Sequence, residues 1–547
     1  MFKFLNIKTN TLGKSAFILA FLTLSSQILA VVRDKIFSIK FGAGIELDVY
    51  YAAFKIPDVV FLLVGTLISA FILIPFFEKI DKDKNESLQD FIDKVFYTFI
   101  FFMTIISLII FIFVPQIAEI FFSGFEGENL QKFIDISRIM LISPMFLGLS
   151  RLFIGLNQRN GYFLSSAITG VFYNLSIIFG ALFLYPFFGF LGVIIGVIIG
   201  AVSYFLVQLP PIFKEGLFPK KIMFFSPKES WDIFKIAAPR SIALVMSDLL
   251  LAFLIARSSI LADGSVTIIA FALNIFMVPI HLIALSYSSA AFPQMTKYFN
   301  EGKIEEFKIF SRKVISRVLF FGFPVLFFFF FYSDIMVGFL LGSGKFGWQE
   351  IHTTALIVSI FSLVVVYKSI LIMLARIFYA MGRTWFVFWS NLLILFVFLI
   401  IYFVLSGDFF VTFLSQSVLD FSFYTEGIGG LLVLAISYTS TLILGAIFSI
   451  KFFKKITHEF SLFSGSQWKR KIFIAFISIA ISRILHQTFF NNLDNSFLSF
   501  FYSLTFAGLS SLILLIIFSE IFGGRDYLEF KKTILNLLKK QFLKKEN

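Results

Sequence analysis

The chain has 547 residues, of which 59% are hydrophobic and 14% are charged, and its formal net charge is +13. So apolar a composition excludes a soluble globular protein of this length and predicts an all-α polytopic membrane protein. The sequence contains no cysteine, which excludes disulfides, thiol catalysis and thiolate metal sites. We expect neither a cofactor nor a metal site.

Long apolar runs predict about fourteen transmembrane helices. They cover residues 15–40, 48–77, 93–118, 133–156, 160–185, 188–211, 234–260, 266–292, 314–341, 351–379, 384–406, 427–452, 470–488 and 496–522. The loops between them alternate in charge: residues 407–426 include no Lys or Arg, whereas residues 1–14 and 451–471 are basic. This positive-inside pattern predicts that both termini are cytoplasmic, and it explains the net charge without nucleic acid.

The chain also repeats internally. Residues 57–75 resemble residues 279–293, and RLFIGLNQR at 151–159 resembles RIFYAMGR at 376–383. Because six spans per repeat is an even number, two pseudo-symmetric lobes of the same orientation are expected around a central cavity. The predicted domains are an N-terminal lobe at 1–211, an interfacial linker at 212–233, a C-terminal lobe at 234–455, two additional helices at 456–523 and a basic cytoplasmic tail at 524–547.

Charged residues interrupt the apolar material of the first two spans. Arg33 and Asp34 lie near the end of the first span, and Lys55 and Asp58 lie early in the second. A charge at membrane depth costs roughly 2.5–3.5 kcal/mol on insertion scales unless it faces water or a partner. Two interpretations remain open: charges that orient the helices at the membrane interface, or a polar, cationic wall inside a translocation cavity.

The same stretch resembles a known family. The run RDKIFSIKFGAGIELD, from Arg33, followed by FKIP, from Phe54, is similar to the start of the MurJ/MviN lipid II flippases. This family belongs to the multidrug/oligosaccharidyl-lipid/polysaccharide transporter superfamily. SRIMLISP, from Ser137, ADGSV, from Ala262, and FYAMGR, from Phe378, extend the resemblance over nearly the whole chain.

The resemblance implies a fold of fourteen spans, the last two forming a groove for a lipid tail. It implies a non-enzymatic monomer of the bacterial inner membrane that flips lipid II, the polyprenyl-diphosphate-linked peptidoglycan precursor, by alternating access. Implied partners are lipid II, membrane lipids and the cell-wall synthesis machinery. Two alternatives stay open: export of another polyprenyl-linked oligosaccharide, and a non-transporting envelope scaffold.

Polar residues inside the spans are the candidate site. The substrate-binding candidates are Arg33, Asp34, Asp48, Lys55, Arg257, Asn274 and Lys368. Arginine suits a diphosphate because its planar fork donates two parallel hydrogen bonds, whereas lysine acts as a point charge. Asp248 either pairs with Arg257 or Lys368 or binds a coupling cation.

Two further features bear on this site. Asn174 and Asn274 either face the cavity or hydrogen-bond between helices. Gln27, Phe61 and Asn274 stand where the family usually has cavity arginines. Fewer cations are therefore expected in this cavity than in the family at large.

Overall fold

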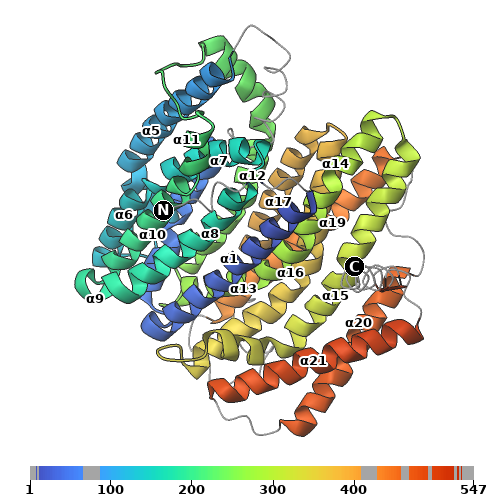
Figure 1. The fold of residues 1–547 in the computed structure, drawn as a ribbon. Helices are drawn as coiled ribbons and strands as arrows, with labels where there is room; N and C mark the ends of the chain where they lie inside the picture. Colours follow the sequence, from blue (N-terminus) through green and yellow to red (C-terminus); the bar gives the residue numbers. More distant parts are fainter. Residues whose placement is uncertain are drawn as a thin grey trace, which may run out of the picture. The chain divides into compact units, whose positions relative to one another are not determined.

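The computed structural model divides the chain into two compact units, Met1–Ala270 and Phe271–Asn547, referred to here as unit 1 and unit 2. It describes residues 8, 12–65, 87–407, 428–457, 467–490, 496–522, 527–528 and 531. Every regular element in these ranges is a helix (Figure 1). The all-α fold class is thereby confirmed.

Unit 1 is built from helices throughout its described residues. They are α1 (Leu12–Phe41), α2 (Ile45–Ala53), α3 (Lys55–Val60), the π-helix η2 (Phe61–Gly65), α5 (Leu88–Phe121), α6 (Gly127–Met140), α7 (Ser143–Arg159), α8 (Phe163–Phe179), the π-helix η4 (Gly180–Leu184), α9 (Tyr185–Phe188), α10 (Phe190–Leu206), α11 (Leu209–Lys214) and α12 (Pro227–Ser258). Helix α13 (Ser265–Ile280) crosses the boundary between the units.

Helices α8 and α10 of unit 1 pack backbone against backbone. The reason lies in the run Gly192-x3-Gly196-x3-Gly200 on α10, which places three glycines on one helix face. A Cβ atom at Gly196 would lie 2.8 Å from the Cα atom of Gly180, at the end of α8. A side chain at these positions would force the two helices apart. Helix α8 also packs along α1, so it joins the N-terminal helix to the rest of unit 1.

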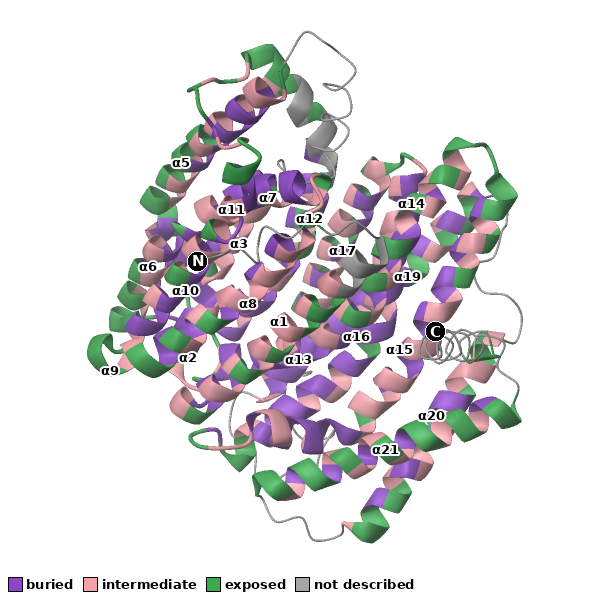
Figure 2. Cartoon of the chain, viewed as in Figure 1, coloured by how far each residue is buried: buried purple, intermediate pink, exposed green. Residues whose placement is uncertain are grey.

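Unit 2 contains the longest helices and the C-terminal pair. After α13 come the π-helix η5 (His281–Leu285), α14 (Ser286–Asn300), α15 (Ile304–Leu341), α16 (Trp348–Ala380), α17 (Thr384–Leu405), α19 (Ile428–Ile456), α20 (Gln467–Phe489) and α21 (Phe497–Ile521). Figure 2 shows buried faces along α13, α16 and α19, and α16 packs against both α15 and α19.

The C-terminal helices α20 and α21 pack on α15 around a buried apolar cluster. Tyr332 and Ile335 of α15 contact Ile479 of α20 and Phe500 of α21 in this cluster. Helix α15 is kinked at Tyr332, where the backbone leaves helical geometry (φ −123°, ψ 16°). The Tyr332 hydroxyl lies 2.8 Å from the Ser482 hydroxyl, so the kink also carries a polar contact to α20.

Twelve described helical segments are long and apolar enough to cross a membrane. They correspond one to one with the third to fourteenth predicted spans. The first predicted span is the 30-residue helix α1, and the second begins with α2, α3 and η2 and continues beyond residue 65, outside the described residues. The loop at 407–426 and the tail at 524–547 also lie almost wholly outside them. The predicted domain borders stay predictions.

The internal repeat corresponds to matching local structures in the two units. The π-helix η2 follows Pro57, and the π-helix η5 follows Pro279. Helices α7 and α16 both end at a glycine with positive φ, Gly161 at 85° and Gly382 at 69°, before the next helix begins. Glycine is favoured at such positions because a Cβ atom would clash there.

Candidate functional site

Arg33, near the C-terminal end of α1, forms a buried ion pair with its neighbour Asp34. Its Nε and Nη2 atoms donate hydrogen bonds to Oδ1 of Asp34 at 3.0 and 2.8 Å. The Arg33 side chain is 15% exposed and that of Asp34 is 8% exposed. The pair is therefore held inside unit 1, where removal from water strengthens it and makes its loss costly.

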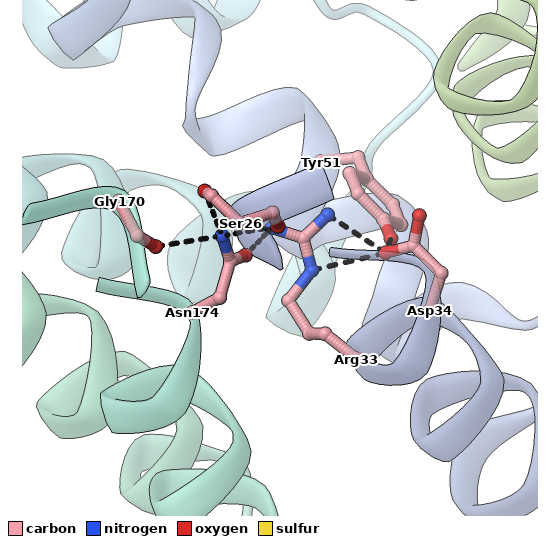
Figure 3. A network of polar contacts seen from close by, with 6 residues as sticks. All are labelled: Ser26, Arg33, Asp34, Tyr51, Gly170 and Asn174. Carbon is pink, nitrogen blue, oxygen red and sulfur yellow. Dashed lines mark hydrogen bonds and ion pairs between the residues drawn. The ribbon is translucent and has the colours of Figure 1, made fainter. Parts of the chain in front are cut away.

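Asn174 of α8 connects this ion pair to the neighbouring helix (Figure 3). Its Oδ1 accepts a hydrogen bond from Nη1 of Arg33 at 3.2 Å. Its Nδ2 donates to the carbonyl oxygen of Gly170 at 3.0 Å and to that of Ser26 at 3.3 Å. The interpretation of Asn174 as a hydrogen-bonding residue between helices is thus confirmed.

Three tyrosines that sequence reasoning missed complete this polar region. The Tyr51 hydroxyl donates to Oδ1 of Asp34 at 3.4 Å, also visible in Figure 3. Tyr50 and Tyr173 both lie within electrostatic range of Arg33 and of Asp58. The signals in the sequence were the pair Tyr50-Tyr51, which follows Asp48 closely, and Tyr173, which directly precedes Asn174.

Asp48 has a different role from the rest of the predicted site: it caps the N-terminus of α13. Its Oδ2 accepts a hydrogen bond from the backbone of Gly264 at 2.7 Å. Its Oδ1 accepts from the backbone N–H of Thr267 at 2.7 Å and from the Thr267 hydroxyl at 2.6 Å. A carboxylate is well suited to this position because the first amides of a helix lack internal partners and the helix dipole is positive there.

The same contact brings two of the family-like segments together. Gly264, in ADGSV, has a φ of 88°, and a Cβ atom there would lie 2.6 Å from the carbonyl oxygen of Ala43, in FGAG. The glycine is therefore required twice, for its backbone angle and for the close approach. The FGAG turn, the ADGSV turn and Asp48 therefore pack together within unit 1.

Lys55, at the start of α3, lies beside two carboxylates. Its Nζ is 3.4 Å from Oδ2 of Asp58, and Asp248 of α12 lies within its electrostatic range. The sequence left three possibilities for Asp248: pairing with Arg257, pairing with Lys368, or binding a coupling cation. Lys55 is a further positive neighbour of Asp248. The guanidinium of Arg257 lies 5.9 Å from the ring of Phe253, one turn away on α12.

Unit 2 holds the last two candidates, Asn274 and Lys368. Asn274 is half-buried on α13. Lys368 of α16 donates from Nζ to the Tyr438 hydroxyl of α19 at 3.1 Å, and Nζ also lies 5.8 Å from the centre of that ring. His281 of η5 is within electrostatic range of Lys368. Both contacts of Nζ are with the uncharged side chain of Tyr438, which supplies no negative charge to offset the ammonium.

The arrangement supports anion binding rather than bond chemistry. Arg33, Lys55 and Lys368 are cations on α1, α3 and α16. Arg33 and Lys55 each have a carboxylate within 3.4 Å or less, whereas the described contacts of Lys368 are with Tyr438. In a low-dielectric interior, a cation without a neutralising carboxylate strongly favours an anionic ligand.

Comparisons with known proteins agree on one family. The family model described as "Lipid II flippase MurJ" matches residues 37–455. A probable lipid II flippase MurJ of Borreliella burgdorferi is 26% identical over 349 residues, 63% of this chain and 68% of the relative. One from Buchnera aphidicola subsp. Acyrthosiphon pisum is 27% identical over 354 residues, 62% of this chain and 68% of the relative.

Solved structures share the fold. The lipid II flippase MurJ in an inward closed conformation matches with a TM-score of 0.73 at 20% identity, covering 92% of this chain and 99% of that chain. A multidrug resistance MATE family transporter in an inward-facing conformation matches with a TM-score of 0.60 at 17% identity, covering 80% of this chain and 99% of that chain. The fold is therefore that of a membrane transporter.

Proposed function

The chain belongs to the lipid II flippase MurJ family, and we propose that it carries lipid II across the bacterial inner membrane by alternating access. No bond is made or broken in this process. The substrate is a polyprenyl chain with an anionic diphosphate and a glycopeptide, so its headgroup needs cations at membrane depth. Such cations are present on α1, α3 and α16 of this chain.

The observation that carries the residue-level proposal is the environment of Lys368. Its described hydrogen bond is to the neutral hydroxyl of Tyr438, so its charge is available to a diphosphate oxygen. We assign to Lys368 the main electrostatic contact in unit 2. Tyr438 orients the ammonium group by accepting one of its three N–H bonds.

Arg33 and Lys55 contribute in a different way, because each is already paired with a carboxylate. A diphosphate that reaches them takes over hydrogen bonds from Asp34 or Asp58, so binding and release exchange one anion for another. Asp248 beside Lys55 is the proposed site of a coupling cation. Lys55 and that cation would occupy the carboxylate alternately, since both are positive.

The topology is part of this proposal. Both termini are cytoplasmic, and the chain works as a monomer with the cell-wall synthesis machinery as its neighbour. Because the chain has no cysteine, single cysteines can be introduced at 407–426 and at 451–471 and exposed to a membrane-impermeant thiol reagent outside intact cells. Labelling of the first segment alone agrees with the topology, and labelling of the second alone refutes it.

The flippase proposal is tested by complementation of a bacterium depleted of its own lipid II flippase. The wild-type chain should restore growth, and Lys368→Met should fail although it inserts normally. Lys345→Met is the matched control, since Lys345 is an exposed cation outside the candidate site. Failure of the wild-type chain at normal expression refutes the function. Full growth with Lys368→Met refutes only the role of Lys368.

A further inference from the structure

A cleft in unit 1, between α5 and the α6–α7 segment, has none of the candidate site residues in its lining. Its volume is about 640 Å³, within the usual range for ligand sites. Met103, Leu108 and Ile142 contribute to its apolar lining, and Asp135 and Arg138 are its charged residues. We refer to it as the Arg138 cleft.

Arg138 has hydrogen-bonding capacity that the protein leaves unused. Within the described chain it donates one hydrogen bond, from Nε to the carbonyl oxygen of Phe111 at 3.2 Å, and its guanidinium lies 4.8 Å from the Phe111 ring. These contacts hold the guanidinium in place, and the N–H donors of its Nη groups have no further protein acceptor in the described residues. A rigid guanidinium with free donors is suited to a phosphate.

A second polar group in the cleft also has no partner. The Ser107 hydroxyl on α5 is buried, and no acceptor or donor among the described residues lies within hydrogen-bond distance. A buried hydroxyl without a partner is costly, and a ligand with an ester carbonyl would satisfy it. The cleft thus offers two groups to a lipid: the Ser107 hydroxyl can donate a hydrogen bond to an ester carbonyl, and Arg138 can bind the phosphate.

The position of the cleft along the helices matches the depth of a lipid headgroup. About 30 Å of helical rise separates Arg138 from Arg159, at the other end of α7, which is the thickness of the hydrocarbon layer. Beyond Arg138, toward the start of α6, the exposed side chains are polar, including Glu128, Lys132 and Asp135. Arg138 therefore lies at the membrane–water boundary, and the apolar part of the cleft extends from it into the membrane.

We propose that the Arg138 cleft binds a phospholipid with a primary ammonium group, of the phosphatidylethanolamine type. The phosphate lies on Arg138, an ester carbonyl on Ser107 and one acyl chain in the apolar part. The ammonium lies on Asp135, one helical turn further toward water, which has one oxygen bonded to Gln131 at 2.9 Å. This site is additional to the proposed lipid II site, and only its assignment to the outer leaflet rests on the proposed topology.

The charges of the cleft predict which headgroup binds. A negatively charged phosphatidylglycerol would satisfy Arg138 but would leave Asp135 without a cation. The quaternary ammonium of phosphatidylcholine has no N–H to donate to Asp135. An aminophospholipid alone pairs with both side chains, so the expected order is phosphatidylethanolamine first and the other two lipids after it.

Native mass spectrometry of the purified full-length protein tests this order, with the three lipids carrying identical acyl chains. Arg138→Gln should weaken phosphatidylethanolamine binding by about tenfold or more, because a charged hydrogen-bonding partner is lost. Asp135→Asn should remove the preference over phosphatidylglycerol. Ile142→Trp, which fills the cleft from an exposed lining position, should reduce binding of all three lipids.

The matched control is Lys132→Gln, which removes one positive charge from the same helix. Lys132 is exposed, lies 3.6 Å from Glu128 and does not line the cleft, so its loss should leave the lipid order unchanged. Equal losses in Lys132→Gln and Arg138→Gln, a preference for phosphatidylglycerol, or no effect of Asp135→Asn would each overturn the proposal. Lipid II binding should be the same in wild type and Arg138→Gln, and a large loss there would show that the cleft holds lipid II instead.

Discussion

Arg33 in unit 1 and Lys368 in unit 2 are both cations on membrane helices, yet they are held in opposite ways. Arg33 donates two hydrogen bonds to a carboxylate and one to an amide. Lys368 donates one to a tyrosine hydroxyl and lies near the face of the same ring. The charge of Arg33 is neutralised within its own unit, whereas Lys368 has no ion pair among the residues that the structure describes.

The difference separates two roles that look alike in a sequence. A neutralised buried cation joins helices, and its removal leaves a buried carboxylate without a partner. A cation held by a neutral hydroxyl contributes little to folding but strongly favours an anionic ligand. Loss of Arg33 should therefore affect stability and transport, whereas loss of Lys368 should affect transport alone.

The largest effect is expected for Arg33→Ala. Removing one partner of a buried ion pair should cost about 3–5 kcal/mol of unfolding free energy and reduce the amount of folded protein in the membrane. The double variant Arg33→Ala/Asp34→Ala should regain much of that stability, because no buried charge is left over. The midpoint of thermal unfolding in detergent measures both. If Arg33→Ala is as stable as wild type, the pair does not hold unit 1 together.

A smaller loss of unfolding free energy is expected for Asp48→Ala. This substitution removes a carboxylate that accepts hydrogen bonds from uncharged donors and, within the described residues, is not paired with a cation. The donors left behind are the backbone N–H groups of Gly264 and Thr267 and the Thr267 hydroxyl. We expect a loss of about 2–3 kcal/mol from the cap and its charge-assisted hydrogen bonds. Asp48→Asn should lose less, since its amide oxygen still accepts. Equal losses in the two variants would count against the capping role.

Lys368→Met should show the opposite profile from Arg33→Ala. Its stability should stay within about 1 kcal/mol of wild type, because an apolar side chain of similar length replaces a cation that forms no ion pair with a carboxylate in the described parts of the chain. Tyr438→Phe should also be nearly as stable but should retain partial transport, since the charge remains. Thermal unfolding of the purified variants measures their stability, and complementation of the flippase-depleted bacterium by the same variants measures their transport. Destabilisation of Lys368→Met as large as that of Arg33→Ala would remove the distinction between the two cations.

The smallest effect on stability is expected for the water-exposed ion pair of Lys8 and Glu215, which gives a reference value for the buried sites at Arg33 and Lys368. The hydroxyl of Tyr162 at 2.5 Å and the ammonium of Lys8 at 3.0 Å hold the pKa of Glu215 below its usual value. A carboxyl group whose pKa is lowered by folding stabilises the folded state at pH values above the pKa of the unfolded state. This contribution disappears as the pH falls through the pKa of the folded state. Because the pair is exposed and screened, it should contribute less than about 1 kcal/mol.

Glu215→Gln should flatten the pH dependence of thermal unfolding on the acid side, below about pH 4.5. Lys94, which lies 3.4 Å from Glu229, provides a control pair that this substitution leaves intact. A wild-type protein whose unfolding midpoint shows the same acid dependence as Glu215→Gln would contradict the assignment.

The sequence by itself determined the features that depend on neighbouring residues. Hydropathy predicted the spans because each helix must bury about twenty apolar residues in the bilayer, whichever helices surround it. Arg33 and Asp34 could be paired from the sequence because they are adjacent. The similarity of residues 151–159 to residues 376–383 could also be recognised from the sequence alone.

Only the tertiary structure decided the partners of the polar side chains. The acceptor of Arg33 on α8 is 141 residues away, and the donors to Asp48 are 216 and 219 residues away. Lys55 lies within electrostatic range of Asp248, because α3 packs against α12. Hydropathy has no information about which face of one helix meets which face of another. That choice depends on backbone approach, as at Gly180 and Gly196, and it decides which buried charges are neutralised and which remain able to bind an anion.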